Sequence, residues 1–554
     1  MRIITAVLIS AVLLSAQLTT AGAQETPSPS PSPTPTEMPS VTPSASATPP
    51  TPATLSVSAN ALNLHPLQTV VLAVTNATGV ISATADAPLA QITVDQNART
   101  VTVVAGAQTG STVVHVSDQS GTRVDLPLRI AQDAARVLSQ DVTLRVTGTT
   151  DPAWLGRQIQ DAVTRNVQRM PGVTMPAITF QPPLLSPGGV AAVLLNFTIP
   201  GGDQYYDVPV TMNVNVQSID VPAFQPPLLF YDDDPEHIVA TGLLYRGRVT
   251  ANAPARLYYY HENSNDPHRV VVVLTGAGSG PSTVQLIDAS AGPNIDVMSV
   301  GHAVTRDFLL MKPGNEGVVV DVPAGAPYIL RDFALNRLDG VAGTVGIRVL
   351  NGGAVDVAVV SAAPTDSDAQ ILAMMNAPRL AGDGHNRTGV FDLNAFTEAS
   401  TTLTYAAGSD DASVTYGAHT PPSAGANGSG HDYGEYGVLR SISFNLTNPS
   451  PQPATVYIYQ RPMGGAVRSS FLVDGSLVQL GCARVSDRYQ IASFTLDPGA
   501  SRRVNLLTMT DGGSNYPIEV GATSTPPQAS TPPISAPDGC FPKAQPAPTP
   551  LPQV

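Results

Sequence analysis

A dense group of oxygen ligands lies near the middle of the chain. Asp232, Asp233 and Asp234 are consecutive, and Glu236 and His237 follow closely. Calcium binds about six to eight oxygen atoms, and secreted β-domains meet this ion at high concentration. Asp232, Asp234 and Glu236 are therefore the candidate metal ligands, and calcium is the candidate ion. A solvated acidic loop is the favoured alternative, because adjacent carboxylates cannot all face one ion.

A tyrosine-rich run provides a second candidate site. Side chains on a β-strand alternate between its two faces, so Tyr258, Tyr260 and Glu262 share one face, and Tyr259 and His261 share the other. An exposed pair of tyrosines beside a carboxylate can stack on a sugar, which makes the first three the candidate ligand-binding residues. The favoured alternative is a contact with a neighbouring strand or domain.

The glycine-rich segment 421–437 is a third place where chemistry is conceivable. It carries His431, Asp432, Tyr433, Glu435 and Tyr436, and two further histidines, His385 and His419, precede it. These residue types suit a metal or acid–base site, but their spacing matches no ligand pattern. We therefore favour a surface loop.

The common enzyme motifs are absent from the sequence. It contains no HExxH, GxSxG, Walker A, EF-hand or CxxC pattern. The run Gly276-Ala-Gly-Ser-Gly280 lies between two apolar segments typical of strands, whereas a phosphate cradle needs a helix N-terminus, so we expect a hairpin turn. The sequence predicts a non-enzymatic protein with no cofactor other than the candidate calcium.

The composition excludes a nucleic-acid partner. The formal net charge is −14, whereas a phosphate-binding face needs clustered lysines and arginines. Hydrophobic residues make up 42% of the chain, enough for several cores. The 46 glycines and 52 prolines are typical of short strands joined by many turns.

The N-terminal residues predict export from the cytoplasm. Arg2, the apolar run 3–16 and the small residues 21–23 form a signal peptide over residues 1–23. Residues 24–53 are a linker rich in Pro, Ser and Thr, which is either an extended polyproline II stalk or a disordered tail. A cleaved signal leaves no transmembrane segment and gives a secreted, extracellular or periplasmic protein. An uncleaved signal would give a protein associated with the cell surface.

The two cysteines, Cys482 and Cys540, fit this compartment. An even count without CxxC spacing favours one disulfide over a metal site, and two free thiols are the alternative. A bridge would close a loop of about 58 residues, which contributes roughly 4 kcal/mol to stability.

Short alternating runs over residues 54–131 predict a small antiparallel sandwich. The stretches TNATGVISATAD (75–86) and ARTVTVVAGAQTGSTVVHVSD (98–118) resemble the bacterial immunoglobulin-like domains that are repeated in surface proteins. The resemblance implies a spacer or adhesive role for this part of the chain, and it implies no catalytic residue.

The rest of the chain is predicted to be mainly β. Residues 132–222 form a small α+β domain, with a helix that Asp151 caps and the pair Pro171-Gly172 stops. Trp154 lies at its start, where core packing is favoured over ligand stacking. Two β-sandwiches follow over 223–364 and 365–522, the second preceded by a short helix at 366–376, and 523–554 is a proline-rich tail. The fold class is therefore several antiparallel β-sandwiches, immunoglobulin-like or jelly-roll-like, with one α+β unit.

These observations favour a secreted or cell-surface modular protein that acts as a scaffold, adhesion or binding protein. Its partner would be a polysaccharide or another surface protein. The alternative is an extracellular carbohydrate-active protein that binds or hydrolyses polysaccharide. Aromatic residues make up only 5% of the chain and include one tryptophan, which weighs against that alternative because sugar platforms rely on such rings.

Overall fold

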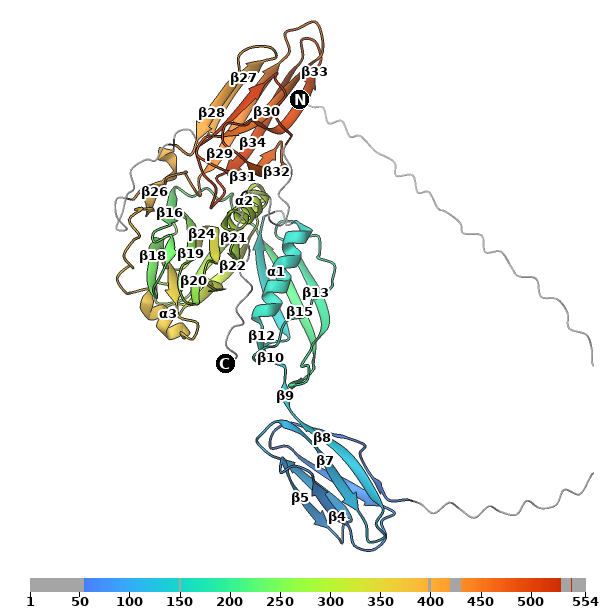
Figure 1. Cartoon of the computed structure of the whole chain (residues 1–554). Coiled ribbons are helices and arrows are strands. Elements are labelled where there is room, and N and C mark those ends of the chain that lie inside the picture. The colour runs from blue at the N-terminus through green and yellow to red at the C-terminus, as the bar shows by residue number, and fades with distance from the viewer. Residues whose placement is uncertain (1–53, 149–150, 397–399, 419–429, 530–539, 541–554) are drawn as a thin grey trace, which may run out of the picture. The chain divides into compact units, whose positions relative to one another are not determined.

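The computed structural model describes residues 54–148, 151–396, 400–418, 430–529 and 540 (Figure 1). The predicted signal peptide and linker, and most of the predicted tail, lie outside these residues. The described chain is mainly β, as predicted, and it forms two compact units. The first unit holds the described residues up to Leu128 except 63–68 and 105–111, and the second holds those two segments and everything from Arg129 onward.

The strands between residues 54 and 131 form two four-stranded sheets with the orders β1-β3-β6-β5 and β2-β8-β7-β4. Alternate residues along these strands are buried, which is the pattern of a sandwich core: Val101 and Val103 on one sheet, and Val114 and Val116 on the other, are all inaccessible to solvent. The strands are β1 (Ser56–Val57), β2 (Leu62–Leu64), β3 (Thr69–Thr75), β4 (Ser82–Ala85), β5 (Ala90–Asp95), β6 (Thr100–Ala105), β7 (Gly110–Ser117) and β8 (Arg123–Ile130).

A ten-stranded sheet is the centre of the second unit. Its order is β13-β15-β11-β22-β21-β24-β19-β16-β26, and β17 also pairs with β19. The strands are β11 (Asp141–Thr147), β13 (Val190–Ile199), β15 (Val208–Ile219), β16 (Leu228–Asp232), β17 (His237–Ile238), β19 (Ala255–Asn263), β21 (Ser282–Asn294), β22 (Gly317–Val322), β24 (Gly340–Asn351) and β26 (Thr388–Asp392).

This sheet crosses the domain boundaries expected at 222/223 and 364/365. Strand β11, from the expected α+β domain, pairs with β22, and β26, from the expected last domain, pairs with β16. Both pairs join residues more than a hundred positions apart in the chain. Local periodicity carries no information about such pairing, which explains the difference from the sequence-based division.

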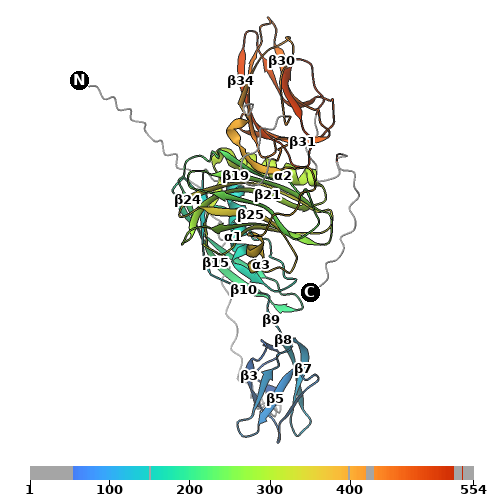
Figure 2. The same ribbon diagram turned by 90° about the vertical axis from the view of Figure 1, so that its left-hand side faces the viewer.

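A second, four-stranded sheet packs against the large one. Its order is β18-β25-β20-β23, with bounds β18 (Gly242–Val249), β20 (His268–Gly276), β23 (Tyr328–Leu335) and β25 (Val355–Ala362). Along β20, Val270 and Val272 belong to the core shared with the large sheet, whereas Val271 and Val273 belong to a smaller core with α3 (Asp368–Met374). This is a sandwich with the predicted short helix on its outer face, next to β25 (Figure 2).

The predicted first helix is present as α1 (Pro152–Arg165). The carboxylate of Asp151 accepts a hydrogen bond from the backbone N–H of Trp154 at 2.8 Å, as expected for an N-cap. Trp154 is buried in the core beneath the helix, in agreement with the packing role. Two short pairs complete this region: β10 (Ala135–Val137) with β12 (Val167–Arg169), and β9 (Gln132–Asp133) with β14 (Tyr205–Tyr206).

A second long helix, α2 (Val297–Gly314), corrects the expectation that everything after residue 230 except the short helix would be β. It packs on β21 and β24 on one side and on strand β31 (Val467–Val473) of the last sandwich on the other. Because both sides are covered, it shows no single apolar stripe with a polar opposite face, which is the pattern by which a helix is recognised in a sequence.

The last sandwich consists of two sheets, β27-β29-β34-β31-β32 and β28-β35-β30-β33. The 3-10 turn η1 (Leu393–Ala395) precedes it, and the predicted disulfide between Cys482 and Cys540 is present. Within the described residues, none of the helices is both long and apolar enough for a membrane span. The strands are β27 (Ser400–Ala406), β28 (Ala412–Tyr416), β29 (Leu439–Thr447), β30 (Ala454–Pro462), β31 (Val467–Val473), β32 (Ser476–Ala483), β33 (Tyr489–Leu496), β34 (Ser501–Met509) and β35 (Ile518–Thr523).

Candidate functional site

A cavity of about 560 Å³ lies where the large sheet meets the loops of the last sandwich. Strand β19 and the residues after β16 form one wall. The loops 417–418, 433–436 and 513–517 form the other, and Val297 at the start of α2 closes one side. All three segments that the sequence singled out for chemistry contribute to this lining, although they are far apart in the chain. Its tyrosines are Tyr258, Tyr260, Tyr433, Tyr436 and Tyr516, and its charged residues are Asp233, Glu236, Glu262 and Arg387.

The tyrosines form a continuous aromatic series. Tyr258 stacks on Tyr231 with ring centroids 5.5 Å apart and on Tyr436 at 5.7 Å. Tyr436 in turn meets Tyr516 edge to face at 5.9 Å. The hydroxyl of Tyr436 donates to the carbonyl oxygen of Ser514 at 2.5 Å, which joins two loops of the last sandwich across the cavity wall. The rings therefore form a fixed aromatic wall.

The strand tyrosines make the contacts with a neighbouring strand and domain that the sequence favoured over exposure, since Tyr258 stacks on Tyr231 of β16 and on Tyr436. Tyr258 is only 2% exposed and Tyr260 only 4%, because the loops 433–436 and 513–517 cover this face of β19. Both side chains nevertheless line the cavity together with the half-buried Glu262. The three residues thus share one face, as strand alternation requires, and that face borders the cavity.

Asp233 is the most unusual acid of the cavity. Its side chain is 3% exposed, and its Oδ2 accepts a hydrogen bond from the Tyr231 hydroxyl at 3.0 Å. Its Oδ1 has no hydrogen-bond partner among the described residues. Burial raises the pKa of Asp233 well above its usual value, and the nearby negative charge of Glu236 adds to this shift. A buried carboxyl that lines a cavity, has a raised pKa and keeps one oxygen without a hydrogen-bond partner is a marker of a functional site.

Arg387 compensates part of the negative charge of the cavity. Its Nη1 donates to Oε2 of Glu236 at 2.7 Å and lies 3.6 Å from Oδ2 of Asp233. The carboxylate of Glu262, at the end of β19, has no ion-pair partner in the described part of the chain. The cavity therefore holds three acids and one guanidinium, and that guanidinium is already engaged by two of the acids.

The structure does not bring Asp232, Asp234 and Glu236 together around a metal. Asp232 is fully buried, with Oδ2 3.0 Å from Nε2 of His261. Asp234 accepts from the backbone N–H of Asp383 at 2.9 Å and faces Arg379, while Glu236 faces Arg387. In the ranges that the structure describes, no group of three or more His, Cys, Asp or Glu residues could hold a metal ion. Successive side chains of an extended backbone point in different directions, so each carboxylate reaches a different partner.

Some side chains of the glycine-rich segment line the cavity, and others are buried in the protein. Tyr433, 56% exposed and stacked on His431 at 5.1 Å, and Tyr436 line the cavity. Asp432 and Glu435 are buried: the first accepts from the backbone N–H of Tyr436 at 2.8 Å, and the second pairs with Arg440. These acids organise the loop that presents the tyrosines.

The two remaining histidines of this candidate site lie apart from the cavity lining. His385 is exposed beside Asp383, with Nδ1 2.8 Å from Oδ1. His419 and residues 421–429 lie outside the described residues.

Sequence reasoning missed Arg387 and the loop 513–517 as parts of this site. The run Gly512-Gly513-Ser514-Asn515 is a strong turn signal, but a turn signal does not reveal what the turn covers. Arg387 precedes an edge strand whose pairing with β16 is long-range, so its approach to Asp233 follows only from the fold.

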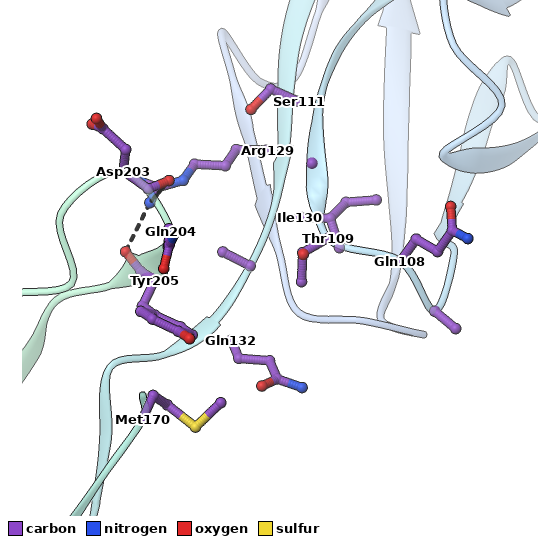
Figure 3. A pocket seen from close by; sticks show the side chains of 13 residues that line it. Gln108, Thr109, Ser111, Arg129, Ile130, Gln132, Met170, Asp203, Gln204 and Tyr205 are labelled. Carbon is purple, nitrogen blue, oxygen red and sulfur yellow. Dashed lines mark hydrogen bonds between the residues drawn. The ribbon is translucent and has the colours of Figure 1, made fainter. Parts of the chain in front are cut away.

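A second, more open hollow of about 720 Å³ offers less chemistry (Figure 3). Its one cationic side chain, Arg129, donates to the carbonyl oxygens of Tyr205, Gly202 and Asp203 at 2.7, 3.1 and 3.2 Å. The guanidinium of Arg129 is thus already hydrogen-bonded to backbone carbonyl oxygens and is less available to a ligand. We therefore regard the tyrosine-lined cavity as the candidate site.

Comparison with known proteins gives no family. No protein-family model matches the chain, and no curated protein does. Among solved structures, the match to tripeptidyl peptidase 2 has 9% identity and a TM-score of 0.14, and it covers 86% of this chain but only 34% of that protein. At such identities and scores, these matches carry no argument about the function of this chain.

Two other matches are equally weak. The Bacteroides ovatus mixed-linkage glucan utilization locus protein SGBP-B, in complex with a mixed-linkage heptasaccharide, is 10% identical with a TM-score of 0.13, covering 55% of this chain and 72% of that one. Yersinia pseudotuberculosis InvD is 12% identical with a TM-score of 0.13, covering 61% and 90%. The function has to be argued from the cavity itself.

Proposed function

We propose that this chain is a secreted, modular β-protein that binds a saccharide in the tyrosine-lined cavity without transforming it. The observation that carries this proposal is Asp233, a buried carboxyl with an unpartnered oxygen, in a cavity that the exposed ring of Tyr433 also lines. Aromatic faces pack against the C–H faces of sugar rings, and buried polar atoms select their hydroxyl groups.

The architecture supports a role outside the cytoplasm. Disulfides persist in oxidising compartments, so the bond between Cys482 and Cys540 is consistent with the export that the sequence predicts. In this proposal the N-terminal sandwich, which resembles the repeats of bacterial surface proteins, is a spacer or adhesive module, and the second unit carries the binding site.

The contacts of Glu236 and Asp233 with Arg387 support binding over catalysis. Glu236 is held by Arg387, and the same guanidinium lies close to Asp233. A glycosidase requires one protonated and one ionised carboxyl on either side of the bond to be cleaved. Because Glu236 and Asp233 both lie against Arg387, neither carboxyl is free to act on a substrate.

One observation favours hydrolysis as a second candidate function. Asp233 has a raised pKa, as a general acid requires, and Glu262 lines the same cavity as a potential second carboxylate. In that case Asp233 would protonate the leaving oxygen, and Glu262 would activate water or attack the sugar.

The decisive experiment measures binding and product release together. The purified exported chain would be titrated calorimetrically with neutral, acidic and amino oligosaccharides, and the same mixtures would be assayed for cleavage. Tyr433→Ala, at an exposed ring of the cavity, is expected to weaken binding about three- to tenfold. Tyr457→Ala removes a half-buried tyrosine of β30 that does not line the cavity, and it serves as the matched control.

Two outcomes would change the conclusion. If no oligosaccharide of the panel binds at millimolar concentration, the saccharide proposal fails. If cleavage products accumulate and both Asp233→Asn and Glu262→Gln stop their release, the chain is a hydrolase and the second candidate replaces the first.

A further inference from the structure

The charge of the tyrosine-lined cavity is unbalanced. Glu236 and Glu262 face it as carboxylates, whereas Arg387 is the one cation of its lining. Asp233 adds little negative charge, because burial raises its pKa well above the usual value. Arg387 is occupied by Glu236 at 2.7 Å and lies near Asp233 at 3.6 Å. The carboxylate of Glu262 and the Oδ1 atom of Asp233 are left as acceptors for a ligand.

The aromatic walls also favour positive charge. The face of a tyrosine ring carries negative electrostatic potential, and a cation within about 6 Å of its centre is attracted, most strongly where water is excluded. Among the lining rings, Tyr433 offers the most surface to such a cation, because it is 56% exposed, whereas Tyr258 and Tyr260 are only 2% and 4% exposed.

The unpartnered oxygen of Asp233 points to a donor on the ligand. A buried acceptor without a hydrogen bond destabilises the chain, and this loss is recovered when a ligand supplies the donor. Asp233 is 3% exposed and lines the cavity, so only a group that enters the cavity can reach it. A protonated amine brings three N–H donors and a positive charge in one group.

Other ligand charges fit less well. An acidic sugar would bring its carboxylate or sulfate close to the carboxylates of Glu236 and Glu262, and like charges repel. A neutral sugar would use the rings but leave Glu262 without a partner of opposite charge. A positively charged group on the ligand would neutralise the carboxylate charge that Arg387 leaves uncompensated.

We infer that the saccharide bound in this cavity carries protonated amino groups, as in an oligosaccharide of glucosamine. The amino group would lie in the tyrosine-lined cavity and donate to Glu262 and to Asp233. This inference rests on the proposed function, because it specifies the ligand of the same cavity.

The test compares two ligands that differ only at nitrogen. Oligomers of glucosamine and of N-acetylglucosamine, equal in length, would be titrated into the full exported chain at pH 6, where the free amine is protonated. The glucosamine oligomer is expected to bind at least about tenfold more tightly. This advantage is expected to shrink as the salt concentration rises, since attraction between charges is screened.

A charge-neutralising variant identifies the acceptor. Glu262→Gln keeps the size of a half-buried side chain at a strand end, and it is expected to reduce the tenfold ratio to about threefold or less. Asp410→Asn removes one negative charge from an exposed turn between β27 and β28, and it should leave the ratio as in the unaltered chain. Thermal melting of both variants would show that they are folded.

The outcomes separate this inference from the proposed function. Equal affinity for the two oligomers, or tighter binding of the acetylated one, overturns the inference and leaves saccharide binding in place. A ratio that Glu262→Gln does not change also overturns it, because the charge would then be recognised elsewhere. If neither oligomer nor any other oligosaccharide binds, both proposals fail.

Discussion

Arg468 on β31 donates from its two terminal nitrogens to the two carboxylate oxygens of Asp296, with distances of 3.0 and 2.9 Å. Asp296 is also the N-cap of α2, where it accepts from the backbone N–H of Ser299 at 3.0 Å. Both charged side chains are buried. This pair therefore fixes the start of α2, including Val297 in the cavity wall, against the last sandwich.

Asp296→Ala is expected to lower the free energy of unfolding by about 3–5 kcal/mol, because it leaves the buried guanidinium of Arg468 without its carboxylate. It also removes the helix cap, which typically contributes about 1 kcal/mol. The measurement is urea unfolding followed by circular dichroism. The control is Asp356→Ala, which breaks a two-point pair with the largely exposed Arg248 and is expected to cost about 1 kcal/mol or less. Equal losses in the two variants would show that the Asp296 pair does not hold the helix.

Gly301→Ala is expected to destabilise the protein, although alanine is usually the better helix former by about 1 kcal/mol. A Cβ at Gly301 would lie 2.0 Å from the carbonyl oxygen of Gly512, a backbone atom that cannot move aside cheaply. The free energy of unfolding is expected to fall by about 1–3 kcal/mol. Ligand binding is also expected to weaken, because loop 513–517 lines the cavity.

The matched control for this substitution is Gly156→Ala in α1. There the new Cβ would meet a proline side-chain carbon at 3.0 Å, so the expected loss is smaller. Thermal melting of both variants measures the difference. A Gly301→Ala protein that is as stable as the unaltered one would mean that α2 and the loop do not approach this closely.

Of the two long helices, the sequence predicted the one whose two faces differ and missed the one that is covered on both sides. Helix α1 was predictable because Leu155, Ile159 and Val163 form one buried stripe after a good cap. Helix α2 was not predictable, because the large sheet and the last sandwich bury opposite sides of it. The continuous ten-stranded sheet was also out of reach, since its strand pairs join distant segments.

At the candidate site, too, the sequence predicted local properties and missed those that depend on distant segments. Strand alternation correctly placed Tyr258, Tyr260 and Glu262 on one face, because that property is local. Their burial depends on Tyr436 and Tyr516, which follow more than 150 positions later in the chain. The run of aspartates suggested one metal site, but the fold provides a separate partner for each carboxylate, and only such long-range contacts reveal it.

Asp233→Asn is expected to raise stability at alkaline pH more than at acidic pH. Burial, with a contribution from Glu236, raises the pKa of Asp233 well above its usual value. The folded chain therefore holds this proton more tightly than the unfolded chain, whose aspartates titrate near pH ~3.9. Wherever the folded state binds more protons, stability falls as pH rises, so the unaltered protein loses stability from about pH 4 up to the pKa of the folded state. Asparagine stays neutral and retains an oxygen that can accept the hydrogen bond of Tyr231.

The measurement is urea unfolding of Asp233→Asn and of the unaltered chain at pH 4, 6 and 8. The stability of the variant relative to the unaltered chain should increase steadily from pH 4 to pH 8. Asp410→Asn is the control, because water solvates that exposed carboxylate in the folded and the unfolded chain alike. A glucosamine oligomer at saturating concentration should reduce the difference between Asp233→Asn and the unaltered chain, since a bound cation favours the ionised carboxyl. A difference that is the same at all three pH values would contradict the raised pKa of Asp233 and remove it as the acid that responds to the ligand.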